Sequence, residues 1–111
     1  LEEFPGLKLI LAHLGNGYWD QTLELAQKHP HVMFDTAIAI SYINSPTTLD
    51  DNEAVEIIKT IGAHRILFGS DYPWINPAGD VERIKGLNIS KRDKALILGD
   101  NAARLFKLAR P

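Results

Sequence analysis

Three short apolar runs, separated by amphipathic stretches, set the pattern of the chain. The runs lie at 8–14 (KLILAHL), 31–37 (HVMFDTA) and 65–70 (RILFGS). Turn residues bracket the first run, with Pro5 and Gly6 before it and Gly15 to Gly17 after it. Near-continuous apolar runs of this length are typical of strands buried on both faces of a parallel sheet. We therefore predict strands in these three ranges.

The stretches between the runs have helical spacing. Residues 19–29 carry Trp19, Leu23 and Ala26 on one face, and Pro30 blocks a longer helix. Residues 52–62 form a second predicted helix that ends at Gly62. Its apolar face consists of Ala54, Ile57, Ile58 and Ile61.

Beyond the third run we predict closing helices over about 79–110. The first is short, at 81–85, and the second is capped by Ser90 and ends at Gly99. The last would turn Ala102, Leu105, Phe106 and Ala109 inward. Strands alternating with helices predict an α/β fold with a parallel sheet, formed by one domain over 1–111.

Composition narrows the class of protein. A chain of 111 residues with 45% hydrophobic and 23% charged residues suits one globular domain. A net charge of −2 argues against a nucleic-acid-binding protein, and no apolar run approaches the ~20 residues of a membrane span. The absence of cysteine excludes thiolate metal sites and suits a cytoplasmic protein, which is the location that we predict.

Three residues with acid–base or metal-binding side chains follow the predicted strands. His13, Asp35 and Asp71 stand at or near the three C-terminal ends, which share one edge of a parallel sheet. A histidine and a carboxylate meeting there can bind a divalent metal or transfer a proton. Each also has a structural alternative: a hydrogen-bonded core histidine for His13, and a turn or capping acid for Asp71. For Asp35, capping of the loop after its strand is the favoured interpretation.

Other residues give weaker signals. His29 and His31 have the spacing of a metal-binding pair, but they lie at the start of their strand, at the opposite end of the sheet from Asp71. His64 likewise comes just before its strand, so we interpret all three as connection residues. Gly15-x-Gly17-x-x-Asp20 is close to a dinucleotide-binding motif. Asp20, however, would put negative charge where a pyrophosphate should bind. A nucleotide-binding βαβ module therefore remains an alternative only.

Four segments together resemble the C-terminal part of the amidohydrolase-related metal-dependent hydrolases, a group that includes aminocarboxymuconate-semialdehyde decarboxylase. They are FPGLKLILAHLGNG, VMFDTA, RILFGSDYPW and ILGDNAARLFKL. The resemblance implies a (β/α)8 TIM barrel whose last three βα units this chain supplies. It implies that Asp71 is a ligand of the catalytic divalent metal and that His13 is the neighbouring acid–base or electrostatic partner. It also implies that Tyr72 and Trp74 line the substrate pocket, unless they are packing aromatics.

The resemblance also implies an incomplete site. The other metal ligands of the family, an H-x-H pair and a further histidine, would precede Leu1, and a barrel of this kind needs about 200 residues or more. The metal that we predict is zinc, with manganese as the alternative. Because a zinc site takes three or more protein ligands, we predict that the isolated chain has little or no activity.

The sequence therefore predicts the C-terminal segment of a metal-dependent hydrolase or non-oxidative decarboxylase that acts on a small, carboxylated organic substrate. The alternative is an inactive truncated domain that self-associates or completes a partner. Unpaired sheet edges favour association, so we also predict a homo-oligomer. We predict neither a nucleic-acid partner nor a membrane partner.

Overall fold

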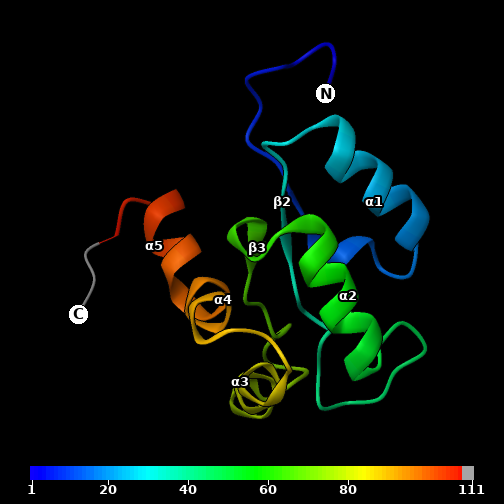
Figure 1. The fold of residues 1–111 in the computed structure, drawn as a ribbon, viewed down its shortest axis with the longest axis vertical. Helices are drawn as coiled ribbons and strands as arrows, with labels where there is room; N and C mark the ends of the chain where they lie inside the picture. Colours follow the sequence, from blue (N-terminus) through cyan, green and yellow to red (C-terminus); the bar gives the residue numbers. More distant parts are fainter. Residues whose placement is uncertain (109–111) are drawn as a thin grey trace.

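Three βα units followed by a group of helices make up residues 1–108, the part of the chain that the computed structural model describes (Figure 1). The strands are β1 (Ile10–Leu11), β2 (Met33–Asp35) and β3 (Ile66–Leu67). The helices are α1 (Trp19–Lys28), α2 (Asp51–Ile61), α3 (Pro77–Gly86), α4 (Lys91–Ala95) and α5 (Asn101–Leu105). Short 3₁₀ turns occupy Ala12–Gly15 and Ala63–Arg65, and a π-helical segment occupies Leu96–Asp100.

The three strands form one parallel sheet with β2 in the middle. Each strand lies inside its predicted range but is shorter. β1 ends because the chain enters a turn at Ala12, and β2 ends at Asp35, where the backbone leaves the sheet. His13 consequently lies in a turn and not in a strand. Helices α1 and α2 are the crossover connections between the parallel strands, as the alternating pattern predicts (Figure 1).

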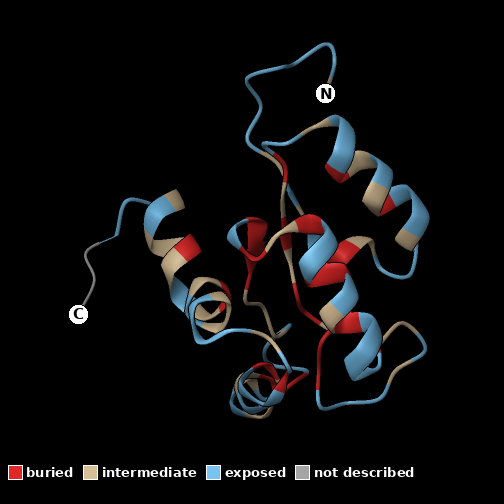
Figure 2. Ribbon diagram, in the orientation of Figure 1, coloured by how far each residue is buried: buried red, intermediate tan, exposed pale blue. Residues whose placement is uncertain are grey.

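The two faces of the sheet have different surroundings. Register partners project on the same side, so Leu11, Phe34 and Ile66 share one face. Phe34 and Ile66 of that face belong to the main core together with Ala26 of α1 and Ile58 of α2, and Leu11 packs against this core. Figure 2 shows buried positions along the strands and on both of these helices. The opposite face carries Ile10, Met33, Asp35 and Leu67. No helix among residues 1–108 is long and apolar enough to cross a bilayer.

The caps of the helices explain where they begin. Asp50 and Glu53 form a capping box at α2, which the sequence analysis missed. Asn76 caps α3 by accepting a hydrogen bond from the Ala78 N–H at 2.9 Å, and Pro77 is at the first helical position. The predicted 81–85 helix was therefore too short. Ser90 caps α4 as predicted, accepting from the Asp93 N–H at 3.0 Å.

The C-terminal helices form one continuous segment. Gly99 does not end a helix, contrary to our prediction, because the π-helical Leu96–Asp100 connects α4 directly to α5 and the residues at both joints keep helical angles. Phe106 lies just beyond α5 and is exposed, so its predicted inward position is wrong. Ala109 lies outside the described residues.

Two buried polar side chains tie the elements together. Arg65 donates to the carbonyl oxygens of Val32, Ala26 and His29 at 2.8 to 3.0 Å, which links the end of α1 to the start of β2. Burial lowers the pKa of its guanidinium. Asn101, fully buried in α5, donates to the carbonyl oxygens of Ala63 and Ile66 at 2.6 and 2.7 Å.

Candidate metal and acid–base site

The ends of the three strands meet at one edge of the sheet, as the parallel order requires. The Ala12–Gly15 turn follows β1 at once, Asp35 is the last residue of β2, and Asp71 follows β3 by four positions. The predicted convergence therefore involves segments that carry all three candidate residues.

The turn after β1 has an unusual backbone. His13 and Leu14 have φ angles of 57° and 48°, in the left-handed region that residues with a Cβ rarely adopt. The next residue, Gly15, has φ of 83°, and a Cβ there would lie 1.8 Å from Thr22 Oγ1. Non-glycine residues held in this region cluster at functional sites. The turn therefore depends on contacts from neighbouring elements.

Those contacts come from the end of β2. Asp35 Oδ1 accepts hydrogen bonds from the backbone N–H groups of His13 and Ala37, both at 3.0 Å. The His13 ring is 2.9 Å from the Ala37 carbonyl oxygen through Nδ1. Because a carbonyl oxygen only accepts, Nδ1 carries the proton. Nε2 makes no hydrogen bond to residues 1–108, so in the neutral ring its lone pair is available.

Thr36, the residue after Asp35, connects the end of β2 to the segment after β3 through hydrogen bonds. The Thr36 hydroxyl accepts from the Gly69 N–H at 3.2 Å, and the Thr36 N–H donates to the Leu67 carbonyl oxygen at 3.0 Å. A Cβ at position 69 would lie 3.3 Å from Ala37 Cβ and 3.4 Å from Asp35 Oδ1, so the segment after β3 passes close to the end of β2. Asp35 and Thr36 therefore hold the segments of His13 and Asp71 from the middle strand.

Asp71 lies on the exposed side of this edge. Its φ is 65°, and its carbonyl oxygen accepts a hydrogen bond from the Trp74 N–H at 3.0 Å. The carboxylate itself forms no hydrogen bond or ion pair with the described residues. Tyr72 and Trp74 are 74% and 84% exposed. Neither aromatic side chain is therefore packed into the described part of the chain.

Residues 1–108 do not form a metal site by themselves. Within residues 1–108, no three His, Asp or Glu side chains lie close enough together to hold a metal ion. The carboxylate of Asp71 is nevertheless an exposed oxygen donor, and His13 Nε2 is a nitrogen donor of the kind that zinc and manganese accept. These donor types suit a divalent metal, which would need further ligands to be bound here.

Four further residues gave weaker signals in the sequence, and the structure shows where each of them lies. His29 and His31 precede β2, with their ring centroids 6.1 Å apart in an edge-to-face contact. His64 is exposed in the 3₁₀ turn before β3. Asp20 is in the first turn of α1, where a pyrophosphate would have to bind. The structure gives no support to a dinucleotide site at this helix.

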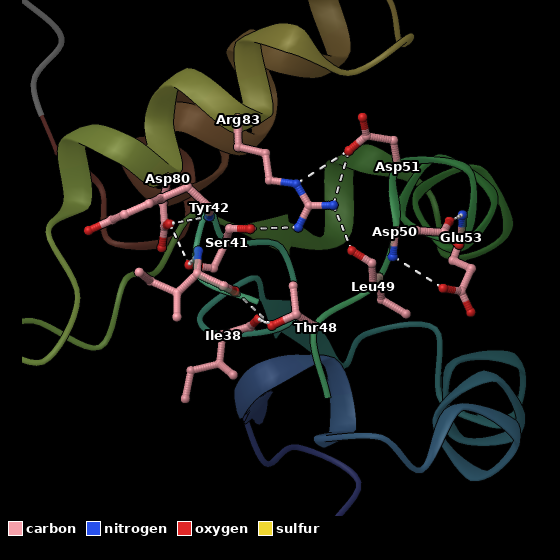
Figure 3. Close-up of polar contacts among 11 residues, drawn as sticks. Ile38, Ser41, Tyr42, Thr48, Leu49, Asp50, Asp51, Glu53, Asp80 and Arg83 are labelled. Atoms are coloured by element: carbon pink, nitrogen blue, oxygen red, sulfur yellow. Dashed lines mark hydrogen bonds and ion pairs between the residues drawn. The ribbon is translucent and has the colours of Figure 1, made fainter. Parts of the chain in front are cut away.

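A polar network that the sequence analysis missed anchors the loop after β2 to α3 (Figure 3). Asp80 Oδ1, fully buried, accepts from Ser41 Oγ at 2.6 Å and from the Tyr42 N–H at 3.0 Å. Arg83 donates to the carbonyl oxygens of Ser41 and Leu49 at 2.7 and 2.6 Å. In the sequence, Asp80 and Arg83 look like an exposed ion pair on one helix face.

Solved structures define the fold. An uncharacterised TIM-barrel protein from Bordetella bronchiseptica matches with a TM-score of 0.77 and 26% identity, over 97% of this chain and 37% of that chain. A dihydroxybenzoic acid decarboxylase from Polaromonas sp. JS666, solved with manganese and the inhibitor 2-nitroresorcinol, gives a TM-score of 0.71 at 23% identity. That match covers 99% of this chain and 36% of that one. The chain therefore has the fold of part of a TIM barrel, which confirms the predicted fold class.

Sequence comparison then gives the family. The family model described as Amidohydrolase matches residues 1–108, and the chain belongs to this family. The γ-resorcylate decarboxylase of Polaromonas sp. is 29% identical over 120 residues, which cover 98% of this chain and 37% of the relative. The chain thus spans a little over a third of the length of that relative. The resemblance predicted from the four sequence segments is confirmed.

Proposed function

We propose that this chain forms the C-terminal part of the active site of a metal-dependent enzyme that acts on a small carboxylated molecule. Among the reactions that the sequence predicts, we favour non-oxidative decarboxylation of an aromatic acid over hydrolysis, because the relative in Polaromonas is a γ-resorcylate decarboxylase. The observation that carries the proposal is the His13 ring, whose Nδ1 is bound to the Ala37 carbonyl oxygen and whose Nε2 remains available.

Asp71 is the metal ligand in this proposal. Its exposed carboxylate follows β3 at the edge of the sheet where TIM-barrel enzymes assemble their active sites. The remaining ligands would come from residues that precede Leu1 in the complete polypeptide. When bound, a divalent metal would supply Lewis-acid polarisation of a substrate oxygen. Zinc and manganese both suit the carboxylate of Asp71, and bound manganese in the Polaromonas decarboxylase structure supports a divalent ion.

The other residues have separate roles. His13 Nε2 would first accept a proton from solvent and then pass it to the substrate as charge develops, because a neutral imidazole with Nδ1 protonated is a proton acceptor at Nε2. Tyr72 and Trp74 would contact the ring of an aromatic substrate through their exposed faces. These assignments agree with the exposure of both aromatic side chains.

The test is Asp71→Asn in the complete polypeptide that carries this chain. We expect the bound metal to fall well below one ion per chain, and γ-resorcylate turnover to fall about 100-fold or more, because the amide is a weaker ligand. Elemental analysis measures the metal, and loss of substrate absorbance measures turnover. Asp20→Asn, exposed in the first turn of α1, is the matched control and should change neither. Normal metal content and turnover in Asp71→Asn would refute the assignment.

Self-association of the chain on its own is the second candidate. The outer edges of β1 and β3 have no strand partner among residues 1–108. Beside β1 lies a largely apolar cavity of 460 Å³, whose lining includes Ile10, Met33, Leu105 and Phe106. Exposed edges and apolar surfaces favour pairing between copies. We expect residues 1–111, expressed alone, to form dimers or larger species in sedimentation experiments, and a monodisperse monomer at high micromolar concentration would refute this.

A further inference from the structure

Asp35 has no direct part in the proposed chemistry, yet it contacts the segments that carry it. Its Oδ1 accepts the backbone N–H groups of His13 and Ala37, and the Ala37 carbonyl oxygen accepts His13 Nδ1–H. These three hydrogen bonds form a closed cycle between the end of β2 and the turn after β1. The cycle fixes the backbone and the ring of His13 together.

Capping of its own loop explains only part of this arrangement. An aspartate that caps the loop after its strand needs only the Ala37 N–H, two residues on. The His13 N–H comes from the turn after β1, 22 residues earlier in the chain. This bond supports a residue whose φ of 57° is unfavourable for a side chain with a Cβ. A carboxylate is suited to the task, since charge-assisted bonds to backbone N–H groups are stronger than neutral ones.

The position of Asp35 in the sheet gives a second, independent argument. Asp35 pairs with Leu67 on the face opposite the one that packs against α1 and α2. In a TIM barrel the helices lie outside, so this opposite face is the interior, and its C-terminal end is where active sites lie. On the other side, the hydroxyl of Thr36, the residue after Asp35, accepts a hydrogen bond from the Gly69 N–H at 3.2 Å. Asp35 therefore stands between the segments of His13 and Asp71.

We propose that Asp35 is a positioning residue for His13. Asp35 Oδ1 accepts hydrogen bonds from the His13 and Ala37 N–H groups, and this holds the Ala37 carbonyl oxygen in hydrogen-bond contact with His13 Nδ1–H. The ring therefore keeps the Nδ1–H tautomer, in which Nε2 carries no proton, and keeps its orientation. The structural part of this inference concerns only residues of this chain. Its kinetic consequence rests on the proposed function.

The experiment compares three variants in the complete polypeptide. Asp35→Ala removes the acceptor, whereas Asp35→Asn keeps an oxygen that can accept both N–H groups. Asp50→Ala is the matched control, because it also removes a carboxylate that accepts a backbone N–H, from Glu53 at 2.8 Å, but at the start of α2. The first readout is the tautomer of the His13 imidazole, from two-bond ¹H–¹⁵N correlations, with the signals assigned by their loss in His13→Gln. The second readout is kcat and KM with γ-resorcylate.

We expect the Nδ1–H tautomer to dominate in the wild type, in Asp35→Asn and in Asp50→Ala, and to lose its dominance in Asp35→Ala. We expect kcat of Asp35→Ala to fall about 10- to 100-fold, as misplacement of a catalytic group does, with a smaller change in KM. A wild-type tautomer in Asp35→Ala, or an Asp35→Asn variant that behaves like Asp35→Ala, would overturn the proposal. If the wild-type polypeptide has no turnover, the proposed function fails, while the tautomer measurement still decides the role of Asp35.

Discussion

The role of Asn101 leads to a quantitative prediction. Its Nδ2 group donates to two carbonyl oxygens, of Ala63 at 2.6 Å and of Ile66 at 2.7 Å, and the side chain is fully buried. Asn101→Ala leaves both oxygens without this donor. The Ala63 oxygen keeps its hydrogen bond from the Ile66 N–H, so the loss corresponds to about one unsatisfied group. Because an unsatisfied buried polar group costs about 1 to 3 kcal/mol, we expect the variant to lose about 1 to 3 kcal/mol of unfolding free energy. This is a substantial part of the total stability of a typical domain.

Urea unfolding of the complete polypeptide, followed by circular dichroism, measures this loss. Asn101→Asp separates hydrogen bonding from packing, because it keeps the size of the side chain but replaces the donor with an oxygen that faces two other oxygens. We expect it to be at least as destabilising as Asn101→Ala. Asn52→Ala, at an exposed position in the first turn of α2, is the control and should unfold near the wild-type midpoint. A loss below about 1 kcal/mol in Asn101→Ala would refute the reasoning.

Three further predictions concern contacts described above. Gly15→Ala should lower the unfolding free energy in urea, because the added Cβ would lie 1.8 Å from Thr22 Oγ1. Adding Thr22→Ala should recover part of this loss, and no recovery would contradict the steric explanation. Arg65→Met should cost at least about 2 kcal/mol in the same assay, because three carbonyl oxygens lose their bond to the guanidinium, although the His29 oxygen keeps the Val32 N–H. Arg65→Lys should recover less than half of this loss, because an ammonium group cannot reproduce the planar guanidinium; a Lys variant as stable as the wild type would contradict that explanation. The hydrogen bond from Lys28 lowers the pKa of Glu24, but both side chains are exposed. Glu24→Gln should therefore leave the urea midpoint unchanged, and a clear shift of the midpoint would contradict this expectation.

Local patterns in the sequence were enough to predict the order of the elements. Apolar runs gave the three strands, and helical spacing gave α1 and the buried face of α2, including Ile57 and Ile58. The extent of α3 could also have been predicted, since Asn76 followed by Pro77 is a recognisable start of a helix. The continuous helix through Gly99 could not, because glycine near a helix end usually indicates a stop and the π-helical segment depends on tertiary packing.

The candidate site was predictable in its positions but not in its contacts. The C-terminal ends of parallel strands must share an edge, so the gathering of the segments of His13, Asp35 and Asp71 followed from the order of the elements. The bond from Asp35 to the His13 N–H spans 22 residues and depends on strand register, which local patterns do not specify. For this reason the sequence alone favoured a simple capping role for Asp35. Asp80 was missed for a similar reason, since its partners Ser41 and Tyr42 are far away in the chain.

The central position of β2 has a consequence for how such a site could be altered. Consecutive residues, Asp35 and Thr36, hold the neighbouring segments on either side, so a change at this pair would move His13 and the segment before Asp71 together. The loop that follows, 38–50, is fastened separately to α3 by Asp80 and Arg83. Selection or protein engineering could therefore vary the exposed parts of that loop, while the spacing of the segments that carry His13 and Asp71 is set separately by β2.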